Sequence, residues 1–246
     1  MTTRETTRLL PRDNAVSAPR TRLRDRAMVT AYGAVQWPWL LRSLSGGRRA
    51  DKLALLDRIG LPHDALPNLG SWKADTMLLT HIVDAIAEVR PAQVVELGCG
   101  ATTLVAAQAL RNLGGGTLTS YDQHADFTDL TGAWVAEHGL TADMRHAPLG
   151  PAPLGWGGHW YQLTDMPAVI DLLIIDGPPW AVHPHVRGAA ECLFDRIPVG
   201  GRVLLDDAAR PGERVVAARW RKRWPGFEFR LDRRGTKGTL VGVRRA

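Results

Sequence analysis

The chain has 246 residues, of which 45% are hydrophobic and 23% are charged, a balance typical of a soluble protein with a sizeable core. The formal net charge of +6 divides into +4 over 1–26, −7 over 27–209 and +9 over 210–246, so an acidic body carries two basic ends. No run approaches the roughly 18 apolar residues of a transmembrane helix, and the two cysteines exclude a disulfide framework or a structural zinc site and favour the cytoplasm.

The N-terminal part of the chain predicts an arm followed by helices. Residues 1–26, rich in Thr and Arg, predict a disordered or loosely attached basic arm. Residues 27–70 predict a helical extension that covers the substrate, with one helix over 28–45, kinked or broken at Pro38, and a second over 51–60. A longer helix is expected from Ser71 to Val89.

From residue 91 onward, strands and helices alternate. Short apolar strands separated by helices predict a parallel sheet that is covered on both faces. Ligands of such sheets bind beyond the carboxyl ends of the strands. The expected strands are 94–97, 117–121, 141–146, 170–175, 203–205, 227–231 and 239–243, the helices are 102–112, 126–138, 185–197 and 212–223, and a loop over 148–161 holds a short strand at 159–162.

Two motifs follow the first two strands. Gly98-Cys99-Gly100 lies between a strand and a helix, where glycine lets a ligand approach the backbone and the helix N–H groups. Glu96, just before this turn, suits a cationic ligand and would repel a pyrophosphate. Asp122 ends the next strand, where a carboxylate accepts hydrogen bonds from ribose hydroxyls. The alternatives are a tight turn without a ligand and a helix-capping aspartate.

With these residues the chain resembles the class I S-adenosylmethionine-dependent methyltransferases over roughly 71–245. The resemblance rests on 96–100, on Tyr121-Asp122 and on the segments 174–179 and 200–207. The lead-in Trp72-Lys73-Ala74-Asp75 resembles that of small-molecule O-methyltransferases. The family implies an α/β, Rossmann-like fold with a seven-stranded, mostly parallel sheet, an antiparallel last strand and helices on both faces.

The resemblance also implies a donor site for S-adenosylmethionine. Glu96 and the glycine turn would hold the methionine end, and Asp122 would hold the ribose. The adenine would lie near Gln123, His146 and Ala147. The complete set of expected donor-binding residues is Lys73, Glu96, Gly98, Cys99, Gly100, Thr102, Tyr121, Asp122, Gln123, His146, Ala147 and Asp176.

Three carboxylates, Asp176, Asp206 and Asp207, end two strands that are expected to be neighbours. Such oxygen ligands suit Mg²⁺ or Ca²⁺, and the catechol-type O-methyltransferases, which this pattern resembles, use a metal there to activate the acceptor hydroxyl. The lysine base of that group has no counterpart after Asp176, so His183 and His185 are the candidate bases, and Asp176 and His183 are the expected catalytic residues. The alternative is that Asp206 caps a helix, Asp207 meets an arginine and the histidines are solvated.

Three further features each have two interpretations. Trp156, Trp160, Tyr161 and Trp180 either wall an acceptor pocket or pack their loops. Cys99 either reacts or, as we favour, fills a slot for a small residue. The basic run 219–223 either binds a phosphate or a nucleic acid, or forms a solvated helix face with its tryptophans packed on the sheet, and the second is favoured.

The leading hypothesis is O-methylation of a small-molecule hydroxyl, with S-adenosylmethionine as the methyl donor. Whether Mg²⁺ or Ca²⁺ assists the reaction is left open. One alternative is an RNA or protein acceptor held by the basic ends, with nucleic acid less favoured. Another is a donor-binding partner subunit without turnover. A homo-oligomer is left open.

Overall fold

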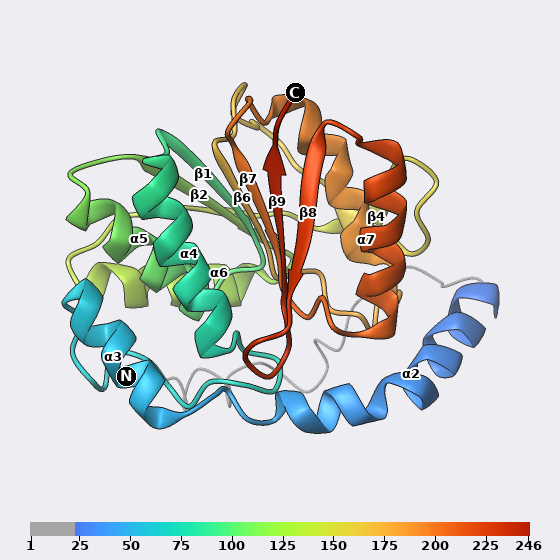
Figure 1. The fold of residues 1–246 in the computed structure, drawn as a ribbon, viewed down its shortest axis with the longest axis horizontal. Coiled ribbons are helices and arrows are strands. Elements are labelled where there is room, and N and C mark those ends of the chain that lie inside the picture. Colours follow the sequence, from blue (N-terminus) through green and yellow to red (C-terminus); the bar gives the residue numbers. More distant parts are fainter. Residues whose placement is uncertain (1–22) are drawn as a thin grey trace.

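The computed structural model describes residues 23–246, and a seven-stranded sheet runs through their centre (Figure 1). Five neighbouring strands of this sheet, β3, β2, β1, β6 and β7, are mutually parallel. Strand β9 runs antiparallel to both of its neighbours, β7 and β8. This topology confirms the predicted fold, including the reversed last strand. Across the sheet the order is β3 (Asp143–His146), β2 (Thr117–Asp122), β1 (Gln93–Leu97), β6 (Leu172–Ile175), β7 (Arg202–Leu205), β9 (Thr239–Arg244) and β8 (Phe227–Asp232).

Two apolar cores form because successive side chains of a strand point to opposite faces of the sheet. Val94 and its register partner Leu172 belong to one core, whereas Val95 and Leu173 belong to the other. Both faces are therefore buried, and the central strands consist of continuous apolar residues. The first core packs against α3 (Arg49–Ile59), α4 (Thr76–Val89), α5 (Ala101–Asn112) and α6 (Ala125–Glu137), and the second against the 3₁₀ helix η2 (Val186–Arg196) and α7 (Pro211–Arg223).

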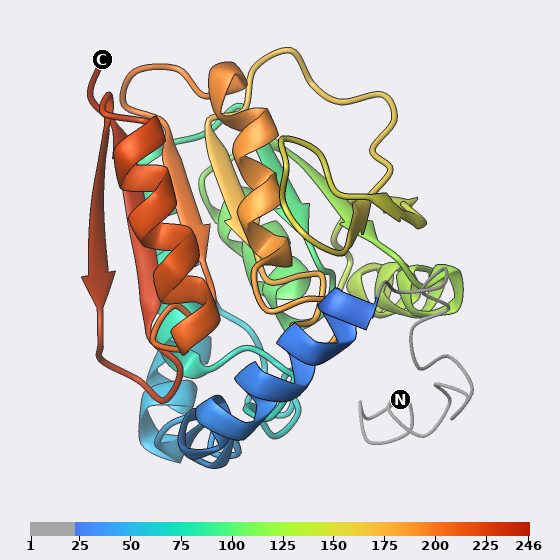
Figure 2. The same cartoon turned by 90° about the vertical axis from the view of Figure 1, so that its right-hand side faces the viewer.

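Helix α2 (Leu23–Ser43) crosses the edge of the sheet at which the parallel strands end (Figure 2). It continues through Pro38, so the helix is not broken there. Residues 23–26, which were expected in the basic arm, are its first turn. The rest of the predicted arm, 1–22, lies outside the described residues.

Helix α4 begins at Thr76, which corrects the expected start at Ser71. Asp75 caps it, because one carboxylate oxygen accepts the N–H of Leu78 at 2.9 Å. Ser71 instead has a φ of +60°, which is incompatible with a helical residue. The four residues from Ser71 to Ala74 are thereby free to line a cavity.

The segment between β3 and β6 and the basic helix α7 pack on the second core. The segment forms a hairpin of β4 (Leu149–Pro151) and β5 (His159–Tyr161), where a single short strand was expected. On α7, Trp220 is fully buried and Arg219 stacks 4.0 Å from the centre of the Trp156 ring. These contacts support packing rather than nucleic-acid binding for this helix. Among the described helices, none has the length and apolar character needed to cross a bilayer.

Candidate active site

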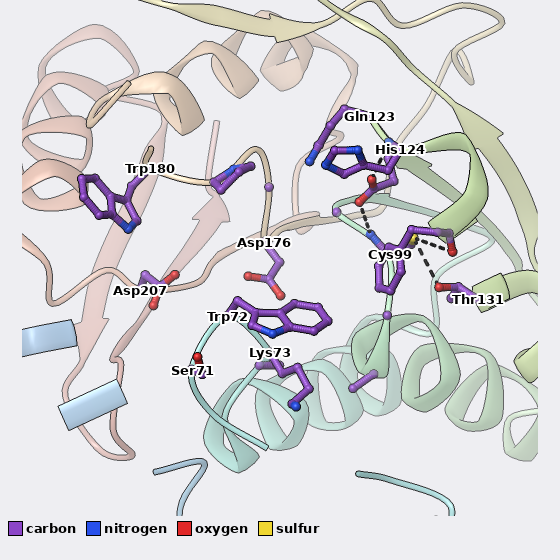
Figure 3. Close-up of a pocket in the computed structure, with 18 of the residues that line it drawn as sticks. Ser71, Trp72, Lys73, Cys99, Gln123, His124, Thr131, Asp176, Trp180 and Asp207 are labelled. Carbon is purple, nitrogen blue, oxygen red and sulfur yellow. Dashed lines mark hydrogen bonds between the residues drawn. The ribbon is translucent and has the colours of Figure 1, made fainter. Parts of the chain in front are cut away.

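A cavity of about 420 Å³ opens at the carboxyl ends of β1, β2, β6 and β7, where the topology predicts a ligand (Figure 3). This volume lies within the ~300–1,000 Å³ typical of small-molecule sites. The end of α2 and the lead-in to α4 cover the cavity. Its charged and polar lining residues are Ser43, Ser71, Lys73, Asp122, Gln123, His124, Thr131, Asp176, Arg187, Asp207 and Arg210.

The glycine turn after β1 forms one wall of this cavity. Gly98 has a φ of +97°, and a Cβ there would lie 2.7 Å from the backbone nitrogen of Gly177, so only glycine fits. Gly100 has a φ of +147°, but the nearest atom to its Cβ position is 3.8 Å away on Phe127. Gly98 is therefore required by the approach of β1 to β6, and Gly100 by the backbone conformation at the start of α5.

Glu96 lies beneath the turn and is completely buried. Its Oε2 accepts hydrogen bonds from the hydroxyls of Ser120 at 2.5 Å and Thr103 at 2.6 Å, whereas its Oε1 has no partner. Burial raises the pKa of Glu96 to about 7, against the lowering effect of these hydroxyl groups. A cation above the turn would favour the ionised carboxylate.

Asp122 links β2 to the glycine turn. Its Oδ1 accepts the N–H of His124 at 2.9 Å, and its Oδ2 accepts the N–H of Cys99 at 3.3 Å. Each oxygen keeps a second lone pair, and the residue lines the cavity. Burial raises the pKa of Asp122, so the backbone N–H groups are needed to stabilise its ionised form.

Five of the expected donor-binding residues do not line the cavity. Tyr121 points to the opposite face of the sheet from Asp122, and its hydroxyl donates to the carbonyl of Thr164 at 3.0 Å. Ala147 is buried in the second core, and exposed His146 contacts the carbonyl of Gln123 through Nε2 at 3.1 Å. The five residues are Glu96, Thr102, Tyr121, His146 and Ala147.

Asp176 enters the cavity from the end of β6 (Figure 3). Its side chain is 14% exposed, and Oδ1 has no hydrogen-bond partner. Burial, and then the nearby Asp206, raise its pKa well above the ordinary range. The carboxylate is therefore disposed to take up a proton.

His183 is not placed to act as a base on a ligand in this cavity. It is 5% exposed, packs against Gly157 and Gly158, and does not line the cavity. Its Nδ1 accepts the N–H of His185 at 3.1 Å, and burial lowers its pKa. As a group that could accept a proton from a ligand in this cavity, Asp176 is better placed than His183. His183 is buried, so it is neither a solvated histidine nor a base that faces the cavity.

The aromatic residues divide between the cavity and the core. Trp180 and Tyr161 line the cavity. Trp72 also lines it, although this residue was not among the aromatic side chains expected to form a pocket wall. Trp156 belongs to the second core, where its indole N–H donates to Glu191 at 2.6 Å. Trp160 is also buried there. Both interpretations of the loop aromatics are thus realised, by different residues.

Cys99 fills a small buried slot, as favoured from the sequence. Its thiol lies 3.5 Å from the hydroxyl of Thr131 and 4.0 Å from the carbonyl of Phe127. Burial raises its pKa well above the ordinary value, which keeps the sulfur protonated and unreactive.

Asp207 meets two arginines, as the alternative interpretation anticipated. Its carboxylate lies 2.9 Å from Arg187 and 2.7 Å from Arg210, and all three side chains are nearly inaccessible. Burial raises the pKa of Asp207, but the cations around it, including Lys237, outweigh burial and hold the pKa at about 2. Sequence reasoning identified none of these partners, because they lie 3 to 30 residues away in the chain.

Asp206 does not cap a helix. Its Oδ2 accepts a hydrogen bond from the ammonium of Lys237 at 3.1 Å, and the same ammonium lies 3.5 Å from Asp207. One oxygen each of Asp176, Asp206 and Asp207 lies within 4.8 Å of the others, so the ammonium shares the space that a metal ion would need. The residues present therefore do not fit Mg²⁺ or Ca²⁺.

The comparisons with known proteins agree with this geometry. The family model of a methyltransferase domain matches residues 95–208, which contain the glycine turn and the carboxylates at the ends of β2, β6 and β7. Residues 95–208 are a methyltransferase domain. No curated protein sequence matches the chain.

Solved methyltransferase structures share the fold of this chain. A methyltransferase from Podospora anserina with bound S-adenosylhomocysteine has a TM-score of 0.55 and 12% identity, over 94% of this chain and 100% of that one. An O-methyltransferase from Bacillus cereus, also with S-adenosylhomocysteine, has a TM-score of 0.53 and 12% identity over 89% and 100%. The tomaymycin-synthesis O-methyltransferase TomG from Streptomyces achromogenes, with S-adenosylmethionine, has a TM-score of 0.50 and 13% identity over 92% and 100%. The class I fold inferred from the sequence is confirmed.

Proposed function

We propose that this protein transfers a methyl group from S-adenosylmethionine to a hydroxyl of a small molecule. The observation that carries the proposal is that Asp122 and Asp176 line one cavity together with the glycine turn of a methyltransferase domain. Methyl transfer asks a protein to align donor and acceptor and to deprotonate the acceptor. This cavity offers a group for each task.

The residues at the glycine turn fit the donor. The backbone from Gly98 to Gly100 is open to the cavity, and the first N–H groups of α5 follow it. Asp122 has lone pairs left for two ribose hydroxyls. Glu96, with an unpartnered Oε1, places a carboxylate below the cationic end of the donor. Lys73 lines the opposite side of the cavity.

Asp176 is the residue that we assign as the base. When bound, S-adenosylmethionine supplies an electrophilic methyl group, and transfer exchanges a carbon–sulfur bond for a carbon–oxygen bond. Asp176 takes up the hydroxyl proton on its carboxylate, whose Oδ1 lies 3.5 Å from the guanidinium of Arg187. This contact with Arg187 orients the Asp176 carboxylate.

The remaining walls favour a small acceptor with an apolar portion. Trp72 and Trp180 flank the cavity, and Leu40 and Leu44 at the end of α2 cover it. We assign residues 27–70 the role of a cover over the substrate on this basis. The O-methyltransferase titles of the structural relatives are in keeping with a hydroxyl acceptor.

Calorimetric titration with S-adenosylmethionine and S-adenosylhomocysteine tests the donor site. We expect one molecule to bind per chain, and Asp122→Ala to weaken binding by about tenfold or more, because a charged partner of the ribose is lost. Asp129→Ala, which removes an exposed carboxylate from the same region, is the matched control. Absence of binding to pure, monodisperse wild-type protein would contradict the proposal. Binding without methylation of any hydroxyl acceptor would favour the partner-subunit alternative.

A further inference from the structure

The ammonium of Lys237 lies inside the carboxylate cluster at the ends of β6 and β7. The Lys237 side chain is 1% exposed, and those of Asp206 and Asp207 are 0% and 2% exposed. Burial lowers the pKa of Lys237, but Asp206, Asp207 and Asp176 outweigh burial and raise it above its ordinary value. The lysine is therefore a permanent buried cation.

The charges of the cluster are balanced without an ion. Asp176, Asp206 and Asp207 face Lys237, Arg187 and Arg210, so the cluster already holds one cation for each of its three carboxyl groups. Glu213 also lies nearby, where burial raises its pKa to about 7. A divalent cation would add two positive charges to this buried group and contact the ammonium directly, which is strongly unfavourable at low local dielectric.

The loop that carries Lys237 is held in place from two sides. The second carboxylate oxygen of Asp75 accepts the N–H groups of Thr236 at 2.7 Å and Lys237 at 3.2 Å. The backbone N–H groups of Ala208 and Ala209 donate to the carbonyls of Gly238 and Lys237 at 2.9 and 3.1 Å. The lysine is therefore fixed to α4 and to the segment that bears Asp206.

Gly235 allows this close approach of the loop to α4. Its φ is +78°, and a Cβ there would lie 2.5 Å from the carboxylate of Asp75. Arg42 of α2 donates to the Gly235 carbonyl at 2.9 Å. These contacts fix the backbone of the loop, and with it the point from which the Lys237 side chain reaches the carboxylates.

From these observations we infer that Lys237, together with Arg187 and Arg210, takes the place of a divalent metal ion, and that this site works without one. The buried cations neutralise the carboxylates at the ends of β6 and β7 and keep Asp176 directed at the cavity. Lys237 is a positioning residue. The inference rests on the proposed function for the role of the cavity, whereas ion binding can be measured without donor or acceptor.

Titration with Mn²⁺, followed by electron paramagnetic resonance on the full-length protein, tests the inference. We expect wild-type protein to bind no Mn²⁺ at this cluster even at the ~10⁻³ M typical of weak oxygen sites. Lys237→Ala leaves three carboxylates with two arginines, so we expect this variant to gain one bound Mn²⁺. The double variant Lys237→Ala, Asp206→Asn should lose this ion again. Lys222→Ala, which removes an exposed lysine from α7, should bind none.

The opposite result is equally clear. One Mn²⁺ per wild-type chain, lost in Asp206→Asn, would overturn the inference, and this measurement needs no lysine variant to fold. A folded Lys237→Ala protein that binds no Mn²⁺ would also overturn it. Failure of methylation with every acceptor would leave the ion-binding result intact, so the two proposals fail separately.

Discussion

Asp176 is the acidic residue of the cavity whose carboxylate is least constrained by hydrogen bonds. Asp122 receives backbone N–H groups on both oxygens and Asp207 is held by two arginines, whereas Asp176 receives no hydrogen bond on Oδ1, which lies 3.5 Å from Arg187. The difference arises from local contacts, because all three side chains end parallel strands at the same edge of the sheet.

We predict that Asp176→Asn lowers kcat by about 10²–10⁴-fold, because the amide cannot accept the hydroxyl proton. The dissociation constant of S-adenosylhomocysteine should change little, since the glycine turn and Asp122 remain. Asp165→Asn, at an exposed position, is the control. Steady-state rates and calorimetry on both variants measure the two effects. An unchanged kcat for Asp176→Asn would remove it from the reaction.

At the scale of elements, α2 contributes a wall of the cavity from outside the methyltransferase domain. The sheet edge provides the acidic lining residues, whereas Leu40 and Ser43 come from α2 and Leu44 directly follows it, all before the methyltransferase domain. Tyr32 of α2 packs edge-on against His185 at 4.9 Å, which anchors the helix beyond the cavity. The choice of acceptor should therefore depend on α2.

We predict that Leu40→Ala raises KM for the acceptor by about tenfold, the size of effect expected from removing methyl and methylene groups from an apolar pocket wall. The affinity for S-adenosylhomocysteine should stay within about twofold, because the donor groups lie on other elements. Leu41→Ala, at a neighbouring position that is 57% exposed, is the matched control. An equal loss of donor affinity in Leu40→Ala would contradict the assignment of α2 as an acceptor cover.

At the scale of the whole molecule, buried acids should shape stability. Burial raises the pKa of Glu213 to about 7 from 4.5. Between these values the native protein holds a proton that the unfolded chain releases, so the free energy of unfolding falls as the pH rises.

We predict that ligand-free wild-type protein loses stability between pH 4.5 and 7, and that Glu213→Gln, which carries no titrating group, loses less. Urea unfolding at both ends of this range measures the difference. Glu228→Gln, at an exposed position, should follow the wild type. Identical pH profiles for Glu213→Gln and wild type would show that Glu213 does not titrate in this window.

The order of helices and strands was predictable because apolar periodicity is local. The strand from 93 to 97 and its glycine turn, and the carboxylates that end β2, β6 and β7, were all identified from short segments of sequence. The start of α4 was predicted wrongly because Asp75, rather than Ser71, provides the capping carboxylate. Asp75 also binds a loop that lies 161 residues away in the sequence, and such a distant contact does not appear in any local pattern.

By itself, then, the sequence determined the parallel sheet, the methyltransferase motifs and the edge at which the acidic residues gather, because strand ends and glycine turns follow from neighbouring residues. Only the tertiary structure decided what the acids contact. It buried His183 away from the cavity and brought Arg187, Arg210 and Lys237 to Asp207. Ion pairs between distant segments depend on how helices and hairpins pack, so no local pattern distinguishes three carboxylates that bind a metal from three that are neutralised by cations.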